Sequence, residues 1–251
     1  MRHRELLYFL ILRDVKIRYK QTAIGIAWAV LQPVLTVAIF TVIFSRFAQF
    51  DTGSIPYPLL ALSGLIIWLF VQNSTTMASN SFITNTNLVT KVYFPRMIMP
   101  ASAALAGLVD FGVGFLILIL FMLYYGVVLS SQVVLFPTFL VLAVILTISF
   151  GTLFSALNVR FRDVKFALPF MLQVWMIASP VFYPASFLTE KWRLIFAINP
   201  LTGILEGFRS SLFGTPFDWP VIGISVISIV AITLLSLFIF KWMEDDFADI
   251  V

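Results

Sequence analysis

The chain has 251 residues, of which 61% are hydrophobic and only 11% are charged. This composition leaves too little polar surface to cover a water-soluble domain of this size. We attribute the net charge of +4 to membrane topology rather than to nucleic-acid binding, and the absence of cysteine excludes disulfides, thiolate catalysis and thiolate metal sites. The solvent for most of the chain is therefore expected to be lipid.

The first 20 residues mix apolar and charged side chains and are too short and too charged to cross a bilayer. We expect an amphipathic helix over 1–20 that lies along the cytoplasmic interface. Its charged residues include Arg13, Asp14, Lys16 and Arg18. Such a helix would turn its basic side toward anionic headgroups or a partner protein. A basic tail that only sets topology is the alternative.

Five stretches without charged residues follow, and each is long enough to cross a hydrocarbon core, which needs roughly 20 residues. They cover 21–45, 52–90, 111–159, 166–189 and 219–240. The third stretch has room for two helices, and a polar break at 129–132 divides it. The sequence therefore predicts an all-α fold with six membrane spans. We place these spans near 22–47, 58–75, 97–125, 133–157, 166–183 and 221–242.

Six spans place both ends of the chain on one side of the membrane. That side carries twelve Lys and Arg residues: Arg2, Arg4, Arg13, Lys16, Arg18, Lys20, Lys91, Arg96, Arg160, Arg162, Lys165 and Lys241. The other side carries Arg46, Lys191, Arg193 and Arg209. By the positive-inside rule, the two ends, including the tail 243–251, and the loops 76–96 and 158–165 should be cytoplasmic.

The segment 184–219 lies between the fifth and sixth spans and carries six charged residues. Asn199 suits an N-cap, Pro200 suits the first helical position, and Gly214 suits a C-terminal stop. These signals predict a helix over 200–213, about 21 Å long, which is too short to cross the membrane. We expect a re-entrant or interfacial helical hairpin on the outer face.

Charged groups near the membrane interior are few. Asp110 lies near the middle of the third span, where a carboxylate is usually functional. The alternative is a buried aspartate that pairs with a basic residue or polar backbone of a neighbouring helix and fixes packing. Glu206 and Arg209, three residues apart, can pair within the outer hairpin. We find neither a GxxxxGK[ST] loop for nucleotide nor a cluster of acidic or His residues typical of membrane enzymes.

Two spans are expected to line a translocation path, because each carries amides and aromatic residues on one face. The candidates are Trp28, Gln32, Thr36 and Phe40 on the first span, with Phe170, Gln173 and Ile177 on the fifth. Their spacing of about four residues places each set on one side of a helix. Since an amide in lipid is costly, both faces should point inward. Packing against other helices is the alternative, and Ile229 on the sixth span is expected to face lipid.

Five ordered groups of residues resemble the type-2 ABC-transporter permeases that export polysaccharides. They are RDVKIRYKQT at 13–22 followed by Gly25, Trp28 and Gln32-Pro33; NLVTKVYFPR at 87–96; NVRFRDV at 158–164; SPVFYP at 179–184; and NPL at 199–201 with EGFR at 206–209. The likeness is greatest to the membrane subunits of O-antigen exporters. Exporters of capsular polysaccharide and teichoic acid are near relatives.

The resemblance implies a single transmembrane domain over 1–251 in the inner membrane that works as a homodimer with two copies of a separate ATPase. That partner would bind ATP and Mg, and this chain would be a transport subunit without a cofactor rather than an enzyme. The cargo implied is a lipid-linked polysaccharide. The segment around 81–95 would couple to the ATPase, through Asn87, Leu88, Val89, Lys91 and Tyr93. A permease for a drug or small lipid, a polyprenyl-lipid enzyme and a passive channel are the alternatives.

Overall fold

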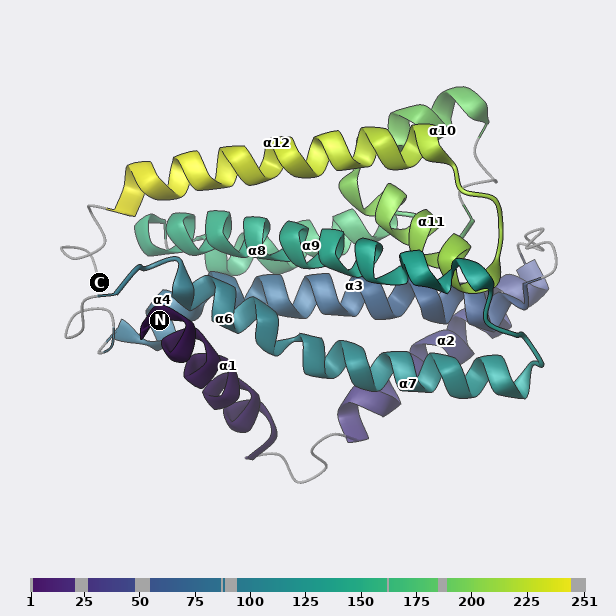
Figure 1. Ribbon diagram of the computed structural model, residues 1–251, viewed down its shortest axis with the longest axis horizontal. Helices are drawn as coiled ribbons and strands as arrows, with labels where there is room; N and C mark the ends of the chain where they lie inside the picture. The colour runs from purple at the N-terminus through teal and green to yellow at the C-terminus, as the bar shows by residue number, and fades with distance from the viewer. Residues whose placement is uncertain are drawn as a thin grey trace.

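The computed structural model describes residues 2–20, 27–47, 55–86, 88, 94–161, 163–184 and 189–244, and every regular element in these ranges is helical. The all-α prediction is therefore confirmed for this part of the chain. In order, the elements are α1 (Arg2–Lys20), α2 (Ala27–Phe47), α3 (Tyr57–Ser79), α4 (Ser81–Thr84), α6 (Ile98–Ala106), α7 (Leu108–Tyr124), η1 (Ser131–Leu135), α8 (Phe136–Arg160), α9 (Val164–Ile177), α10 (Glu190–Phe196), α11 (Pro200–Phe213) and α12 (Trp219–Met243) (Figure 1).

Four helical units in the described ranges are long and apolar enough to cross a membrane. They are Tyr57–Ser79, Ile98–Tyr124, Ser131–Arg160 and Trp219–Met243. Two shorter apolar helices, Val30–Ile43 within α2 and Val164–Ile177, coincide with the first and fifth predicted spans. The structure is thus that of an integral membrane protein with at least four candidate spans, and the count of six remains a prediction.

The fifth predicted span is shorter than expected. It was expected to reach residue 183, but α9 ends at Ile177. Pro180 explains the difference, because proline disfavours helical backbone at the preceding residue, here Ser179, and cannot donate a helical hydrogen bond. The segment 178–184 is consequently non-helical, and its backbone needs hydrogen-bond partners from elsewhere.

The third predicted span is divided into α6 and α7 at Gly107. A Cβ atom at this residue would lie 1.9 Å from the Oγ atom of Ser74 on α3. Any larger residue would therefore collide with α3, and glycine permits both the close approach and the kink.

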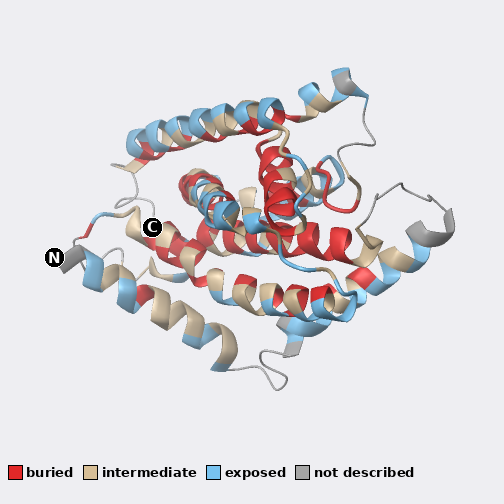
Figure 2. Ribbon diagram, turned by 45° about the vertical axis from the view of Figure 1, so that its right-hand side comes forward, coloured by how far each residue is buried: buried red, intermediate tan, exposed pale blue. Residues whose placement is uncertain are grey.

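The helix α3 is the centre of the molecule. Most of its residues are buried, and Figure 2 shows buried residues concentrated along it. It contacts α2, α6, α7, α8, α9 and α11. The helix α12 packs outside α8 and α11, as Figure 1 shows. The core is thus built around one apolar helix wrapped by its neighbours.

The beginning of α1 and the end of α12 lie at the same end of the molecule (Figure 1). There, Leu10 of α1, Phe82 of α4, Met99 of α6, Val159 of α8 and Phe240 of α12 belong to one buried cluster. This arrangement agrees with an even number of crossings. The side of the membrane on which this end lies remains a prediction.

The expectation for Ile229 is wrong. Its side chain is only 2% exposed and packs in the main core, because α12 turns this face toward its neighbours α8 and α11. Ile227 and Leu234 on the same helix are 70% and 63% exposed and are the better lipid-facing positions.

The local signals in the outer segment are confirmed. The helix α11 has the predicted bounds, the Asn199 side chain accepts a hydrogen bond from the Leu201 N–H at 3.1 Å, and Gly214 ends the helix in the left-handed conformation with φ of 75°. Left-handed backbone favours glycine because a Cβ atom would be strained there. Whether this hairpin enters the membrane from outside remains a prediction.

The packing of α8 on α3 gives a testable prediction. A Cβ atom at Gly151 would lie 2.5 Å from the Cβ atom of Ala78. Gly151→Ala should therefore destabilise the purified protein by about 1–3 kcal/mol through overpacking. The measurement is its melting temperature in detergent. Gly112→Ala is the matched control, because that Cβ atom meets nothing within 4 Å, and equal melting temperatures for the two variants would contradict the packing.

Candidate functional site

A cleft of about 400 Å³ lies between α2, α3 and α9. Its lining residues are Gln32, Thr36 and Phe40 from α2; Leu65, Trp68, Leu69 and Gln72 from α3; Pro169, Gln173 and Met176 from α9; and Phe182 from the segment that follows. Residues three or four apart lie on one side of a helix. Each helix therefore contributes one stripe, and each stripe carries a glutamine.

Four of the predicted path residues meet in this cleft: Gln32, Thr36, Phe40 and Gln173. Trp28 lies in an adjoining cavity of about 230 Å³. Phe170 and Ile177 do not line either space, and they are exposed on α9 by 68% and 71%. The structure thus unites the amides of the first and fifth predicted spans, and the channel-lining role of all seven residues remains a prediction.

The contribution of α3 was missed by the sequence analysis. Trp68 and Gln72 line the cleft between the stripes of α2 and α9. Gln72 and Asn73 interrupt a long uncharged apolar run, so the cost of an amide in lipid could have identified them, as it did Gln32 and Gln173. No local signal indicated that α3 would be the floor of the same cleft.

Asp110 at the start of α7 forms an ion pair with Arg18 of α1, and the Tyr19 hydroxyl donates a hydrogen bond to the same carboxylate. Arg18 and Asp110 line the adjoining cavity beside Gln32. Burial raises the pKa of Tyr19 above its usual value, so the phenol keeps its proton at neutral pH and can donate. The structure therefore agrees with the second alternative for Asp110, in which the carboxylate pairs with a basic residue of a neighbouring helix.

The charged residues of α1 divide into two groups. Arg13 and Asp14 pair with each other at 2.8 Å, and Lys16 is exposed. Arg18 is turned toward α7, where it pairs with Asp110, and the placement of α1 at the cytoplasmic interface remains a prediction. Burial lowers the pKa of Arg18, but a guanidinium remains charged in proteins. The helix α1 is therefore fixed to α7 by a charged contact in addition to its packing on α6.

Of the predicted coupling residues, only Leu88 is among the described residues. Its backbone N–H donates to the Asn85 carbonyl at 2.9 Å, and its half-buried side chain packs on the buried cluster that includes Leu10 and Phe82. Asn87, Val89, Lys91 and Tyr93 lie outside the described residues. The coupling role of the group remains a prediction.

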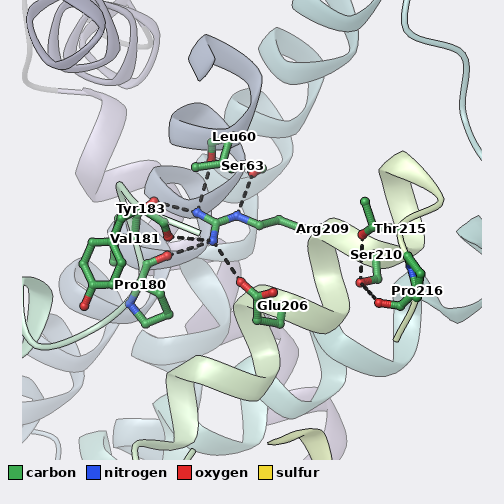
Figure 3. A network of polar contacts seen from close by, with 10 residues as sticks. All are labelled: Leu60, Ser63, Pro180, Val181, Tyr183, Glu206, Arg209, Ser210, Thr215 and Pro216. Carbon is green, nitrogen blue, oxygen red and sulfur yellow. Dashed lines mark hydrogen bonds and ion pairs between the residues drawn. The ribbon is translucent and has the colours of Figure 1, made fainter. Parts of the chain in front are cut away.

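Arg209 of α11 supplies hydrogen-bond donors to the non-helical segment after α9 (Figure 3). Its side chain is buried. The Nη1 atom donates to the Pro180 carbonyl at 2.8 Å, and Nη2 donates to the Val181 carbonyl at 2.7 Å. Irregular backbone at membrane depth must find such partners within the protein, because lipid offers none. A guanidinium, with five donors in a rigid fork, suits this task.

The same guanidinium reaches α3 and its own helix. Its Nη2 atom donates to the Leu60 carbonyl at 3.2 Å, and the Glu206 carboxylate accepts from Nη1 at 3.3 Å. The predicted Glu206–Arg209 pair is therefore confirmed. The sequence analysis missed the carbonyl contacts, since their partners lie far away along the chain. Gly64 makes room for them, because a Cβ atom there would lie 2.2 Å from the Val181 oxygen.

The segment held by Arg209 closes one part of the cleft. The Phe182 ring stacks on the Phe40 ring of α2 with centroids 3.8 Å apart and an interplanar angle of 11°. The Tyr57 hydroxyl donates to the Phe182 carbonyl at 3.0 Å. Asn199 adds a second attachment, since its Nδ2 atom donates to the Ser179 hydroxyl at 2.8 Å. Arg209 and Asn199 thus position a cleft residue through the backbone that carries it.

Comparison with known proteins identifies the class. Residues 5–213 match the family model described as "ABC-2 type transporter". The chain therefore belongs to the ABC-2 type transporter family, whose members are membrane transport proteins.

The similarity to individual relatives extends over nearly the whole chain. O-antigen export system permease protein RfbA of Myxococcus xanthus is 26% identical over 98% of this chain and 95% of its own. RfbA of Klebsiella pneumoniae is 27% identical with the same coverage. Polysialic acid transport protein KpsM of Escherichia coli is 23% identical over 92% of this chain and 88% of its own.

The Arg209 network predicts a large effect of a conservative change. Arg209→Lys keeps the charge but loses the fork of donors, so buried carbonyl groups are left unpaired. We expect a destabilisation of roughly 3 kcal/mol, measured by thermal unfolding in detergent. Arg193→Lys is the matched control, because Arg193 pairs with Asp218 at a partly exposed site and should lose less than about 1 kcal/mol. Similar losses in both variants would contradict the role of Arg209.

The link between α1 and α7 predicts energetic coupling across 92 residues of sequence. In a double-mutant cycle, Arg18→Gln and Asp110→Asn should each lower the melting temperature, and the double variant should lose clearly less than the sum. The expected coupling is about 1 kcal/mol or more, since each single change strands a partly buried partner. Additive effects would show that the two side chains do not interact.

Proposed function

We propose that this chain is the membrane permease of an ATP-driven exporter whose cargo is a lipid-linked polysaccharide of the O-antigen type. The observation that carries the proposal is the similarity to permeases named for O-antigen export, which extends from one end of the chain to the other. The cleft of amides and aromatic rings between α2, α3 and α9 supports it. Such a surface can contact hydroxyl groups and apolar faces of sugars without fixed charges.

The working unit in this proposal is a homodimer in the inner membrane with two copies of a separate ATPase. The ATPase would bind ATP and Mg, because the sequence of this chain has no GxxxxGK[ST] loop. Six spans, cytoplasmic ends and an outer re-entrant hairpin belong to the same proposal. The shared position of the described ends of α1 and α12 supports it.

Force from the ATPase would enter through the segment around 81–95 and through α1. Leu88 supports this assignment, because it packs on the cluster that joins α1, α4 and α12. The Arg18–Asp110 contact would carry movement of α1 to α7. Arg18 and Asp110 line a cavity that also includes Gln32.

Export of a capsular polysaccharide is the second candidate, supported by the similarity to KpsM over 92% of this chain. A teichoic acid, a drug or a small lipid is a further alternative. A gene deletion in the native host separates these cargoes, because the undelivered molecule accumulates inside the cell.

The proposed function predicts that deletion removes the polysaccharide from the cell surface and leaves its lipid-linked form inside. The measurement is gel analysis of surface and membrane-bound glycans, and the intact gene should restore export. Complementation with a Leu88→Asp variant should fail while the permease is still inserted, because a charge would disrupt the packing of the coupling segment on the cluster that joins α1, α4 and α12. Normal surface polysaccharide in the deletion strain would refute the function.

A further inference from the structure

Three glutamines in the cleft have no hydrogen-bond partner within the described part of the chain. Gln32 lies on α2, Gln72 on α3 and Gln173 on α9, and all three line the same space. Among the residues that the structure describes, none of the three side-chain amides is hydrogen-bonded; at Gln72 it is the backbone carbonyl that accepts from the Thr76 hydroxyl, at 2.8 Å. Gln72 is half-buried, whereas Gln32 and Gln173 are exposed, so the donors and acceptors of all three amides are open to a molecule in the cleft. Three such groups around one cleft therefore indicate a polar occupant.

A fourth polar group lies in the floor of the cleft. Trp68 is fully buried, and its indole N–H has no hydrogen-bond partner among the described residues. The ring contacts Trp175 edge to face at 5.7 Å between centroids, whereas the Trp175 N–H donates to Asn199 at 2.9 Å. Of these two neighbouring indoles, only the one that lines the cleft is unpaired. Buried indole N–H groups usually have a partner.

The described residues that line the cleft include no charged side chain. The nearest cation in the adjoining cavity, Arg18, is already paired with Asp110. An anionic group would find no counter-charge in the cleft, and desolvating it would be costly. A lipid chain would leave the amides unpaired. The volume of about 400 Å³ lies in the range of roughly 300–1,000 Å³ that small-molecule sites occupy.

We propose that this cleft is a subsite for one uncharged sugar residue of the exported polymer. The amides of Gln32, Gln72 and Gln173 would exchange hydrogen bonds with its hydroxyl groups. The aromatic and aliphatic lining would contact its apolar face. The site rests on the proposed export function and narrows it to a polymer whose transported segment is neutral. Gln72 and Trp68 on α3 would then determine specificity together with the path residues on α2 and α9.

The first test uses single cysteines in this naturally cysteine-free chain, within the complete permease and its partner ATPase in cells. Gln72→Cys and Gln173→Cys are labelled with a water-soluble maleimide in a strain that makes the polymer and in one that lacks its first glycosyltransferase. The polymer should slow labelling of both cysteines roughly five-fold. Ser131→Cys, at an exposed position outside the cleft, should react equally in the two strains. If either variant does not insert into the membrane, Thr36→Cys on α2, which also lines the cleft, takes its place.

Equal labelling in both strains would overturn the subsite, because the cleft would then hold only water. Protection in both strains would also overturn it, because lipid or protein would fill the cleft. The deletion experiment decides the export function separately. If the deletion strain retains polymer inside the cell but labelling is the same with and without polymer, the subsite is refuted and the export function is not.

The second test addresses neutrality. Gln173 is exposed at the edge of the cleft, so a charge there is compatible with folding. Gln173→Lys and Gln173→Glu should reduce export by similar factors if the cargo is uncharged. Export preserved by the lysine and blocked by the glutamate would show an anionic cargo and overturn the assignment.

Discussion

The buried guanidinium of Arg209 fixes the position of the non-helical segment that follows α9. The helix α9 ends before Pro180, and the following carbonyl groups cannot be satisfied by lipid or by their own segment. Arg209 donates to two of them and to α3 at the same time. The outer helix α11 is thereby connected to the centre of the molecule.

This connection determines the form of the cleft. Phe182 is carried by the segment that Arg209 holds, and its ring stacks on Phe40 of α2. The cleft therefore combines residues of two apolar helices and α3 with one residue placed by α11. At the other side, the Arg18–Asp110 contact fixes α1 next to the adjoining cavity. The segments expected to receive force and those expected to guide the cargo are thus in physical contact.

The sequence allowed prediction of features that depend on neighbouring residues. Asn199, Pro200 and Gly214 predicted the bounds of α11 because caps act locally, and the cost of amides in lipid identified Gln32 and Gln173. Features that depend on distant partners were missed or incomplete. Arg209 reaches Leu60 across 149 residues, and Arg18 reaches Asp110 across 92, and neither pairing has a periodic signal. The face of α12 that carries Ile229 was wrongly assigned, although Ser225 and Ser236, at helical spacing from Ile229, are buried on the same side.

The central claim is that Arg209 holds Phe182 against α2. It is tested most directly by Phe40→Cys together with Phe182→Cys in the otherwise cysteine-free chain, using a short bifunctional thiol reagent in native membranes. We expect efficient cross-linking within one chain when Arg209 is present and a large loss when Arg209→Lys is added. Equal cross-linking in both backgrounds would show that the segment keeps its position without the guanidinium and would contradict the account.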